Sequence, residues 1–215
     1  MDAKNFIAKR IAQEFADGDV VNLGIGAPTL VANYLPEGIK ITLQAELGFT
    51  GAGSAAAPGE EDWDLVDAGG KPATILPGGA TFDSATSFCL IRGGHLDATV
   101  LGAMEVDEEG SLANWWIPGK MMAGMGGAMD LVVGARRVII AMEHTAKGRP
   151  KILKKCTLPL TAVKEVDMIV TEMGVFKYLP RLTLVEIAPG VTVDDIKAVT
   201  EAAFDVAGDL KVISV

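Results

Sequence analysis

The feature that most constrains the fold is a series of short apolar runs, each bounded by glycine, proline or charged residues. Continuous apolar runs of this length are typical of strands buried on both faces of a sheet. The hydrophobic fraction is 49% and the aromatic fraction 6%, so aliphatic residues and alanine must build the core. We therefore expect an α/β fold with an open, mostly parallel sheet and helices on both faces. The predicted strands lie at residues 20–26, 41–44, 73–76, 98–104, 137–142, 167–171 and 183–187.

Helical patterns fill several of the intervals between these strands. Apolar residues recur at helical spacing in 3–17, and Pro28 stands in the first turn of the next predicted helix. Thr192 precedes the last one as a capping residue. The predicted helices cover 3–17, 28–34, 83–92, 126–135 and 193–207, whereas 48–62 is rich in Gly, Ala, Ser and Pro and is predicted to be a long functional loop. With no internal repeat or linker, residues 1–215 are expected to form one domain.

Charge and composition exclude several classes of protein. The net charge of -9 argues against a nucleic-acid-binding protein, which would carry a basic face. No apolar run reaches the ~20 residues that a membrane-spanning helix needs, and the first residues resemble an amphipathic helix more than a signal peptide. Cys89 and Cys156 are isolated, which predicts reduced, mostly buried thiols in a cytoplasmic protein.

Glu46 stands directly after the predicted strand 41–44 and is followed by Gly48. In open α/β sheets, ligands collect beyond the carboxyl ends of the strands. A carboxylate at such a place is costly unless it is paired, hydrated or used in chemistry. From position alone, a surface or helix-capping glutamate remains the alternative interpretation.

The segment Leu43-Gln44-Ala45-Glu46-Leu47-Gly48 resembles the signature Gln/His-Ser-Glu-Asn-Gly of the family I CoA-transferase β subunits. The resemblance extends over nearly the whole chain and is closest to the butyrate–acetoacetate and acetate CoA-transferases. Its further motifs are 21–29, Asp67-Ala68-Gly69-Gly70, Phe82-Asp83-Ser84, 90–95, Ala113-Asn114-Trp115, Ile117-Pro118-Gly119-Lys120 and 124–131. Two positions depart from the signature, since Ala45 replaces the usual Ser and Leu47 the usual Asn.

The resemblance implies a fold shared with ribose-phosphate isomerases and a role for several residues. Glu46 corresponds to the family's nucleophile, which forms a glutamyl-CoA thioester in a ping-pong reaction between a short-chain acyl-CoA and an acid such as acetoacetate, butyrate or acetate. Gly127 and Ala128, with Gly126, correspond to the donors that stabilise the oxyanion. The neighbours that the resemblance implies are Asn22, Gly24, Gly26, Leu47 and Gly48.

The resemblance also implies partners and substrates. Coenzyme A and acyl-CoA enter as substrates, and no metal, flavin or nicotinamide is needed. An α subunit of similar size completes the enzyme, commonly as an α2β2 heterotetramer. The loss of a polar side chain at Leu47 is expected to alter the acyl preference.

Other functions remain as alternatives. The same architecture serves sugar-phosphate isomerases and ligand-sensing domains, and Ala45 and Leu47 leave open a non-catalytic subunit. The turn Gly24-Ile25-Gly26 resembles a dinucleotide loop but has Thr29 at the third glycine position. His95 and His144 have no partner at ligand spacing, which argues against a metal site. The pair Trp115-Trp116 predicts core or interface packing, and 105–109 predicts a solvated acidic turn.

Overall fold

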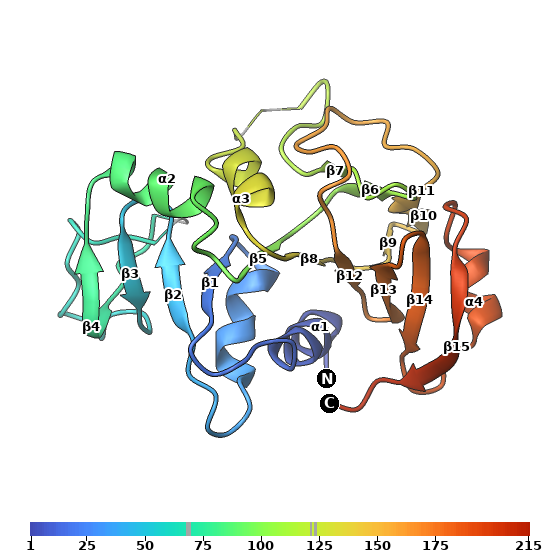
Figure 1. Cartoon of the computed structure of the whole chain (residues 1–215), viewed down its shortest axis with the longest axis horizontal. Coiled ribbons are helices and arrows are strands. Elements are labelled where there is room, and N and C mark those ends of the chain that lie inside the picture. The colour runs from blue at the N-terminus through green and yellow to red at the C-terminus, as the bar shows by residue number, and fades with distance from the viewer. Residues whose placement is uncertain (68–69, 121, 123) are drawn as a thin grey trace.

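A ten-stranded open sheet runs through the molecule in the order β15-β14-β13-β12-β8-β5-β1-β2-β3-β4 (Figure 1). The computed structural model describes residues 1–67, 70–120, 122 and 124–215, so Ala68 and Gly69 of the second sequence motif lie outside the described residues. The five central strands are all parallel: β2 (Thr42–Ala45), β1 (Val20–Leu23), β5 (Ala98–Leu101), β8 (Val138–Ala141) and β12 (Met168–Val170).

Antiparallel strands extend this parallel centre on both sides. One side carries β3 (Phe49–Ala52) and β4 (Ile75–Thr81). The other carries β13 (Gly174–Tyr178) and β14 (Leu182–Ile187), followed by β15 (Asp205–Val212), which lies parallel to β14. The prediction of an α/β fold with an open, mostly parallel sheet is therefore confirmed.

Helices cover both faces of the sheet because its central strands are apolar on both sides. In β8, Ile139 and Ala141 face the cluster that contains Ile7 of α1, whereas Val138 and Ile140 face the cluster that contains Leu131 of α3. One face is covered by α1 (Ala3–Ala12) and the 3-10 helix η1 (Ala27–Tyr34), and the other by α2 (Ser84–Arg92), α3 (Ala128–Gly134) and α4 (Val193–Ala198).

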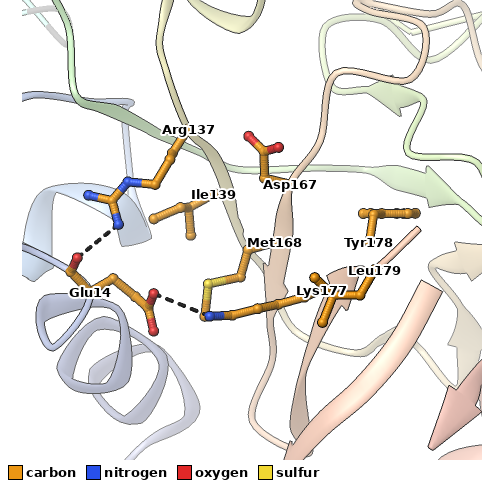
Figure 2. Close-up of a pocket in the computed structure, with 8 residues that line it drawn as sticks. All are labelled: Glu14, Arg137, Ile139, Asp167, Met168, Lys177, Tyr178 and Leu179. Carbon is orange, nitrogen blue, oxygen red and sulfur yellow. Dashed lines mark hydrogen bonds and ion pairs between the residues drawn. The ribbon is translucent and has the colours of Figure 1, made fainter. Parts of the chain in front are cut away.

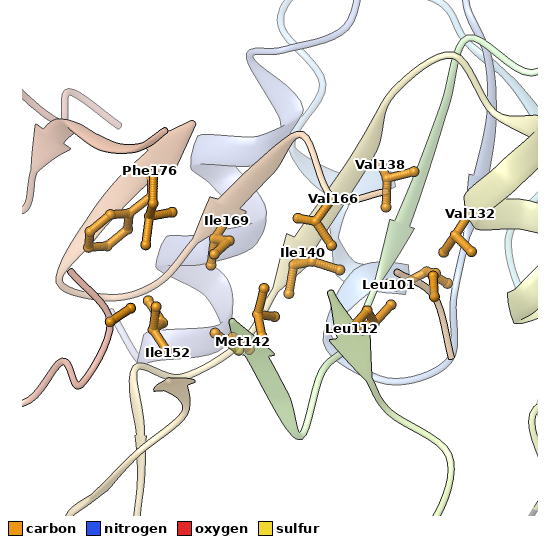
Figure 3. Close-up of a cluster of buried hydrophobic side chains, with 14 of the residues drawn as sticks. Leu101, Leu112, Val132, Val138, Ile140, Met142, Ile152, Val166, Ile169 and Phe176 are labelled. Carbon is orange, nitrogen blue, oxygen red and sulfur yellow. The ribbon is translucent and has the colours of Figure 1, made fainter. Parts of the chain in front are cut away.

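The second face has an additional layer of short strands. A three-stranded sheet places Leu112 and Ile152, both fully buried, against Ile140 and Ile169 of the main sheet (Figure 3). These strands are β6 (Glu105–Asp107), β7 (Leu112–Ala113) and β11 (Ile152–Leu153), next to the hairpin of β9 (Thr145–Ala146) and β10 (Arg149–Pro150). The expected solvated turn at 105–109 is therefore partly wrong, because its first three residues pair as a strand.

Asp107 shows why that acidic segment folds inward. Its side chain is buried and accepts the backbone N–H groups of Ser111 at 2.9 Å and Glu109 at 3.1 Å. Backbone donors can stabilise a buried carboxylate without a cation. The prediction that the side chain of Asp107 is exposed, which rested on its charge alone, is therefore wrong.

Two predicted helices are shorter than expected. The first ends at Ala12, and after it the Asp19 carboxylate accepts the Ala16 N–H at 3.0 Å, forming a turn that competes with further helix. The last ends at Ala198, and from Asp205 the chain pairs with β14 instead. An open sheet edge supplies hydrogen-bond partners that no local sequence pattern reveals.

The predicted loop 48–62 also begins differently, because Phe49–Ala52 forms β3 and pairs antiparallel with β2.

Cys89 is exposed and Cys156 half-buried, so the expectation of mostly buried thiols is wrong for Cys89; both cysteines are free. Trp115 and Trp116 are half-buried, with ring centroids 5.8 Å apart. Among the helices of the described residues, none has the length and apolar character to cross a membrane.

Candidate functional site

Glu46 lies in a tight turn at the carboxyl end of β2, where the chain reverses into β3. The turn depends on Gly48, whose N–H donates to the Ala45 carbonyl at 3.0 Å and whose φ is +129°. A Cβ atom on Gly48 would collide with the Phe82 carbonyl oxygen. A residue with a side chain could adopt neither this φ nor this close approach without strain, so Gly48 fixes the place of Glu46.

The Glu46 carboxylate lies against two glycines that are distant in the sequence. The Gly127 N–H donates to Glu46 Oε1 at 3.0 Å. A Cβ atom would lie 2.8 Å from Oε1 if built on Gly126, and 2.7 Å from Oε2 if built on Gly127. The structure thus brings together the strand-end glutamate and the glycine segment before α3, and glycine at both positions leaves room for the carboxylate.

Ala128, the other predicted backbone donor, has a different partner. Its N–H donates to the Met125 carbonyl at 3.1 Å, and its side chain is buried at the first position of α3. Across the residues that the structure describes, no Lys, Arg or His lies within ion-pair distance of Glu46. The carboxylate is therefore stabilised here by a neutral backbone donor.

A buried polar network lies directly beneath this turn. Ser87 of α2 donates its hydroxyl to the Glu46 carbonyl at 2.7 Å, and Gln44 Nε2 donates to Ser87 Oγ at 3.0 Å. Asn22, predicted as a neighbour of Glu46, donates to Gln44 Oε1 at 3.1 Å and so reaches Glu46 through two intermediates. Sequence reasoning did not select Ser87, although its position four residues before the buried Ile91 places it on the inward face of a helix.

The other predicted neighbours shape the surroundings. Gly24 donates its N–H to the Val100 carbonyl at 2.8 Å, and a Cβ there would lie 3.1 Å from both that oxygen and Leu101 Cδ2. Gly26 has a φ of +89° and precedes η1. These two glycines form the turn after β1. Leu47 is 54% exposed beside Glu46.

His144 and Cys156 are poor candidates for the chemistry. Burial, with a smaller contribution from Lys151, lowers the pKa of His144 to about 4, and its ring nitrogens contact the hydroxyls of Thr171 and Thr200 at 3.0 and 2.8 Å. Burial and nearby carboxylates raise the pKa of Cys156 to about 12, so this thiol stays protonated. Within the described part of the chain, no three His, Cys, Asp or Glu side chains are grouped to hold a metal ion.

A pocket of about 200 Å³ lies at the opposite end of the parallel strands from Glu46 (Figure 2). It opens at the amino ends of β8 and β12, whereas Glu46 follows the carboxyl end of the parallel strand β2. Its cationic side chains have partners: Arg137 lies 3.1 Å from the Asp19 carboxylate and donates to the Glu14 backbone carbonyl at 2.9 Å, and Lys177 lies 3.6 Å from the Glu14 carboxylate. The pocket is lined by Glu14, Arg137, Ile139, Asp167, Met168, Lys177, Tyr178 and Leu179.

Known proteins share both the sequence and the fold. The family model for Coenzyme A transferase matches residues 4–199. The β subunit of the acetate CoA-transferase of Escherichia coli (strain K12) is 62% identical over 98% of this chain and 97% of its own length. The corresponding subunit of a probable succinyl-CoA:3-ketoacid coenzyme A transferase of Bacillus subtilis (strain 168) is 50% identical over 96% of both chains.

Among solved structures, an acyl-CoA transferase from Escherichia coli O157:H7 superposes with a TM-score of 0.77 at 22% identity. That match covers 99% of this chain but 43% of the other, and it supports the fold. The family model covers most of the sequence, and the two bacterial relatives match over nearly their full lengths. The chain therefore belongs to the Coenzyme A transferase family.

Proposed function

We propose that this chain, as one domain over residues 1–215, is the β subunit of a CoA-transferase and that Glu46 is its nucleophile. The observation that carries the proposal is the Glu46 carboxylate at the carboxyl edge of the sheet, held by the Gly127 N–H at 3.0 Å. A cation at this place would neutralise the carboxylate and weaken it as a nucleophile. A neutral backbone donor orients the carboxylate and leaves its negative charge available for attack.

The proposed reaction has two exchanges on the same carboxyl group. A Glu46 oxygen attacks the acyl-CoA thioester carbon; a C–O bond forms, the C–S bond breaks, and CoA leaves as the thiolate. The thiolate then attacks the glutamyl carbonyl of the mixed anhydride and releases the first acid as its carboxylate. The second acid reverses both steps on the glutamyl-CoA thioester. The reaction consumes no proton and needs no oxidant or metal.

Each attack on the glutamyl carbonyl places negative charge on the oxygen that remains bound to carbon. The Gly127 N–H lies 3.0 Å from Oε1, within the distance range of oxyanion donors. Gly126 has a φ of +52° and holds the backbone in the turn that presents this donor. We assign the Gly126–Ala128 segment to oxyanion stabilisation, with Gly127 as its contact to Glu46.

The relatives support the proposed substrates and partner. One relative is an acetate CoA-transferase and another a succinyl-CoA:3-ketoacid transferase, so we propose short acids such as acetate, acetoacetate or butyrate as acyl carriers. Both relatives are named as one subunit of their enzyme, which supports an α subunit as partner, and we propose an α2β2 assembly in the cytoplasm. CoA enters as part of the substrate.

A second candidate is a non-catalytic or ligand-sensing subunit of the same fold. The observation that favours it is Leu47, whose exposed side chain stands where the family signature has a polar Asn. In this case Glu46 would be a structural residue, and its replacement would leave the exchange activity of the assembled enzyme unchanged.

Intact-mass spectrometry tests the two candidates. The chain is co-purified with its α subunit and incubated with acetoacetyl-CoA or butyryl-CoA. The transferase predicts a CoA-sized adduct that maps to Glu46, disappears on addition of acetate, and is absent in Glu46→Ala. A folded, assembled enzyme that exchanges CoA without an adduct on Glu46, or equally well as Glu46→Ala, would contradict the proposal.

A further inference from the structure

Three polar side chains interrupt the apolar interior in one row across adjacent strands. Asn22 of β1 is the register partner of Gln44 on β2 and of Thr99 on β5. All three are buried, with exposed fractions of 4%, 3% and 0%. In the next strand, Val138 pairs with Thr99 and the interior becomes apolar again. The polar row is thus confined to the strands nearest Glu46.

The row continues as a chain of hydrogen bonds to the Glu46 backbone. Thr99 Oγ1 donates to Asn22 Oδ1 at 3.4 Å, and Asn22 Nδ2 donates to Gln44 Oε1 at 3.1 Å. Gln44 Nε2 donates to Ser87 Oγ at 3.0 Å, and Ser87 Oγ donates to the Glu46 carbonyl at 2.7 Å. The chain connects β5, β1, β2 and α2 to the turn that carries the carboxylate.

Backbone carbonyls fix the orientation of both amide groups in this chain. Asn22 Nδ2 also donates to the Gln44 carbonyl at 3.0 Å, and Gln44 Nε2 also donates to the Ala45 carbonyl at 3.2 Å. Carbonyl oxygens are acceptors, so both amide groups can point one way only, and the Ser87 hydroxyl must donate to Glu46. A buried network with all its donors used in one direction has a single low-energy arrangement.

We propose that Ser87, Gln44 and Asn22 are positioning residues that hold the Glu46 main chain so that its carboxylate stays between Gly126 and Gly127. This inference rests on the proposed function of Glu46. The glutamyl carbonyl is attacked twice in one cycle, by the thiolate and by the second acid, each time in contact with the Gly127 N–H. Positions for a Cβ on the two glycines lie 2.8 and 2.7 Å from the carboxylate oxygens, so this space tolerates little displacement of Glu46.

Ser87→Ala removes the donor to Glu46 and tests the inference in the assembled enzyme. Because misplacement of a reacting group by ~1 Å can cost about 100-fold in rate, we expect kcat to fall about 10- to 100-fold. The KM for acyl-CoA should stay unchanged, since Ser87 is fully buried. The rate of formation of the Glu46–CoA adduct should fall by the same factor as kcat.

Ile91→Val is the matched control on the same helix. Ile91 is also fully buried one turn further along α2, and the substitution removes one methylene group from the core. It should lower the thermal unfolding midpoint while kcat remains at the wild-type value. A purely structural role for Ser87 predicts that Ser87→Ala behaves like this control.

Two further variants keep the test decisive. Ser87→Cys preserves the size but weakens the donor, and its kcat should lie between those of the wild type and Ser87→Ala; it decides the question if Ser87→Ala does not assemble. Gln44→Met in the Ser87→Ala background should add little further loss, because members of one network are not additive.

The outcomes separate the inference from the proposed function. If the wild type forms the adduct and Ser87→Ala or Ser87→Cys turns over like Ile91→Val, the positioning role is overturned and the function of Glu46 stands. If the assembled wild type forms no adduct on Glu46, both are overturned.

Discussion

Glu14, near the amino ends of the parallel strands, and Glu46, beyond their carboxyl ends, are held by different means. Near the amino ends of β8 and β12, the Glu14 carboxylate lies 2.8 Å from Arg10 of α1, which also contacts Glu186 on β14 at 2.6 Å. At the carboxyl edge, Glu46 contacts the Gly127 N–H, and beneath it lie uncharged amides and hydroxyls. Glu14 is paired with cationic side chains, whereas the Glu46 carboxylate is held by a neutral backbone donor.

This difference matches a structural role for Glu14 and the proposed chemical role of Glu46. A paired, part-buried carboxylate contributes to the fold. It is also shielded from reaction, because its partner cation neutralises its charge and fixes its position. Arg10 also shows the cost of such pairs, since its buried Nη1 has no hydrogen-bond partner among the described residues. A carboxylate held by one neutral donor adds little stability but remains free to form a covalent bond. The contrast can be tested by four changes, taken in order of decreasing effect.

Glu46→Gln should abolish CoA exchange while leaving the fold intact. The amide keeps the size of the side chain but its oxygen is uncharged and poorly nucleophilic, and losing a covalent nucleophile costs about 10⁴-fold or more in kcat. Steady-state exchange assays and thermal unfolding of the assembled enzyme measure the two effects. Glu37→Gln, at an exposed position outside the predicted loop 48–62, is the control and should match the wild type in both. Retained activity in Glu46→Gln would contradict the proposal that the Glu46 carboxylate is the nucleophile.

Gly127→Ala should reduce kcat by about 10²- to 10³-fold, as the loss of an oxyanion donor does. The added methyl group would lie 2.7 Å from Glu46 Oε2 and push the carboxylate away from the N–H donor. Gly102→Ala is the control, because a Cβ there meets nothing within 4 Å. Equal activity in both variants would show that the close approach of the glycine backbone is dispensable.

Lowering the pH should destabilise the folded protein through His144, which follows the carboxyl end of β8. Its folded-state pKa is about 4 against an ordinary 6.5, so between these values the unfolded chain binds the extra proton. The contribution of neutral His144 is therefore full above pH 6.5 and is lost as the pH falls toward 4, by about 3 kcal/mol.

Urea unfolding of the wild type and His144→Gln between pH 4 and pH 7.5 measures this loss. Glutamine does not titrate, so the difference in unfolding free energy between the two proteins should change by about 3 kcal/mol across the window. A difference that is constant with pH would mean that His144 titrates normally in the folded protein.

Glu14→Gln should leave CoA exchange unchanged and lower the unfolding free energy by about 2 kcal/mol. The substitution removes the charge that faces Arg10 and Lys177, but Glu186 still pairs with Arg10, which limits the loss. Chemical denaturation and the exchange assay are compared with those of Glu46→Gln. If Glu14→Gln lost activity and kept its stability, Glu14 would have a chemical role and not the structural role given to it here.

Much of this molecule is predictable from local sequence, and the exceptions have physical causes. The central strands were predicted because their residues are apolar on both faces, as in β8 with its four buried residues. The end of α1 and the strand β15 were not, because a turn at Asp19 and the free edge of β14 decided them. The inward fold of Asp107 was missed because its charge predicted exposure, whereas backbone N–H groups of its own turn and of the distant Cys156 stabilise the buried carboxylate.

The sequence by itself determined the α/β class and the strand-end position of Glu46. Both depend on apolar runs of strand length and on the turn residues that bound them. Only the tertiary structure decided that Gly127 donates to Glu46, because the two residues are 81 positions apart. It also decided that Asn22, Gln44 and Ser87 form one network, since strand register and the packing of α2 bring them into contact. Hydrogen bonds between distant segments form only when the sheet has set their register, and no local pattern encodes them.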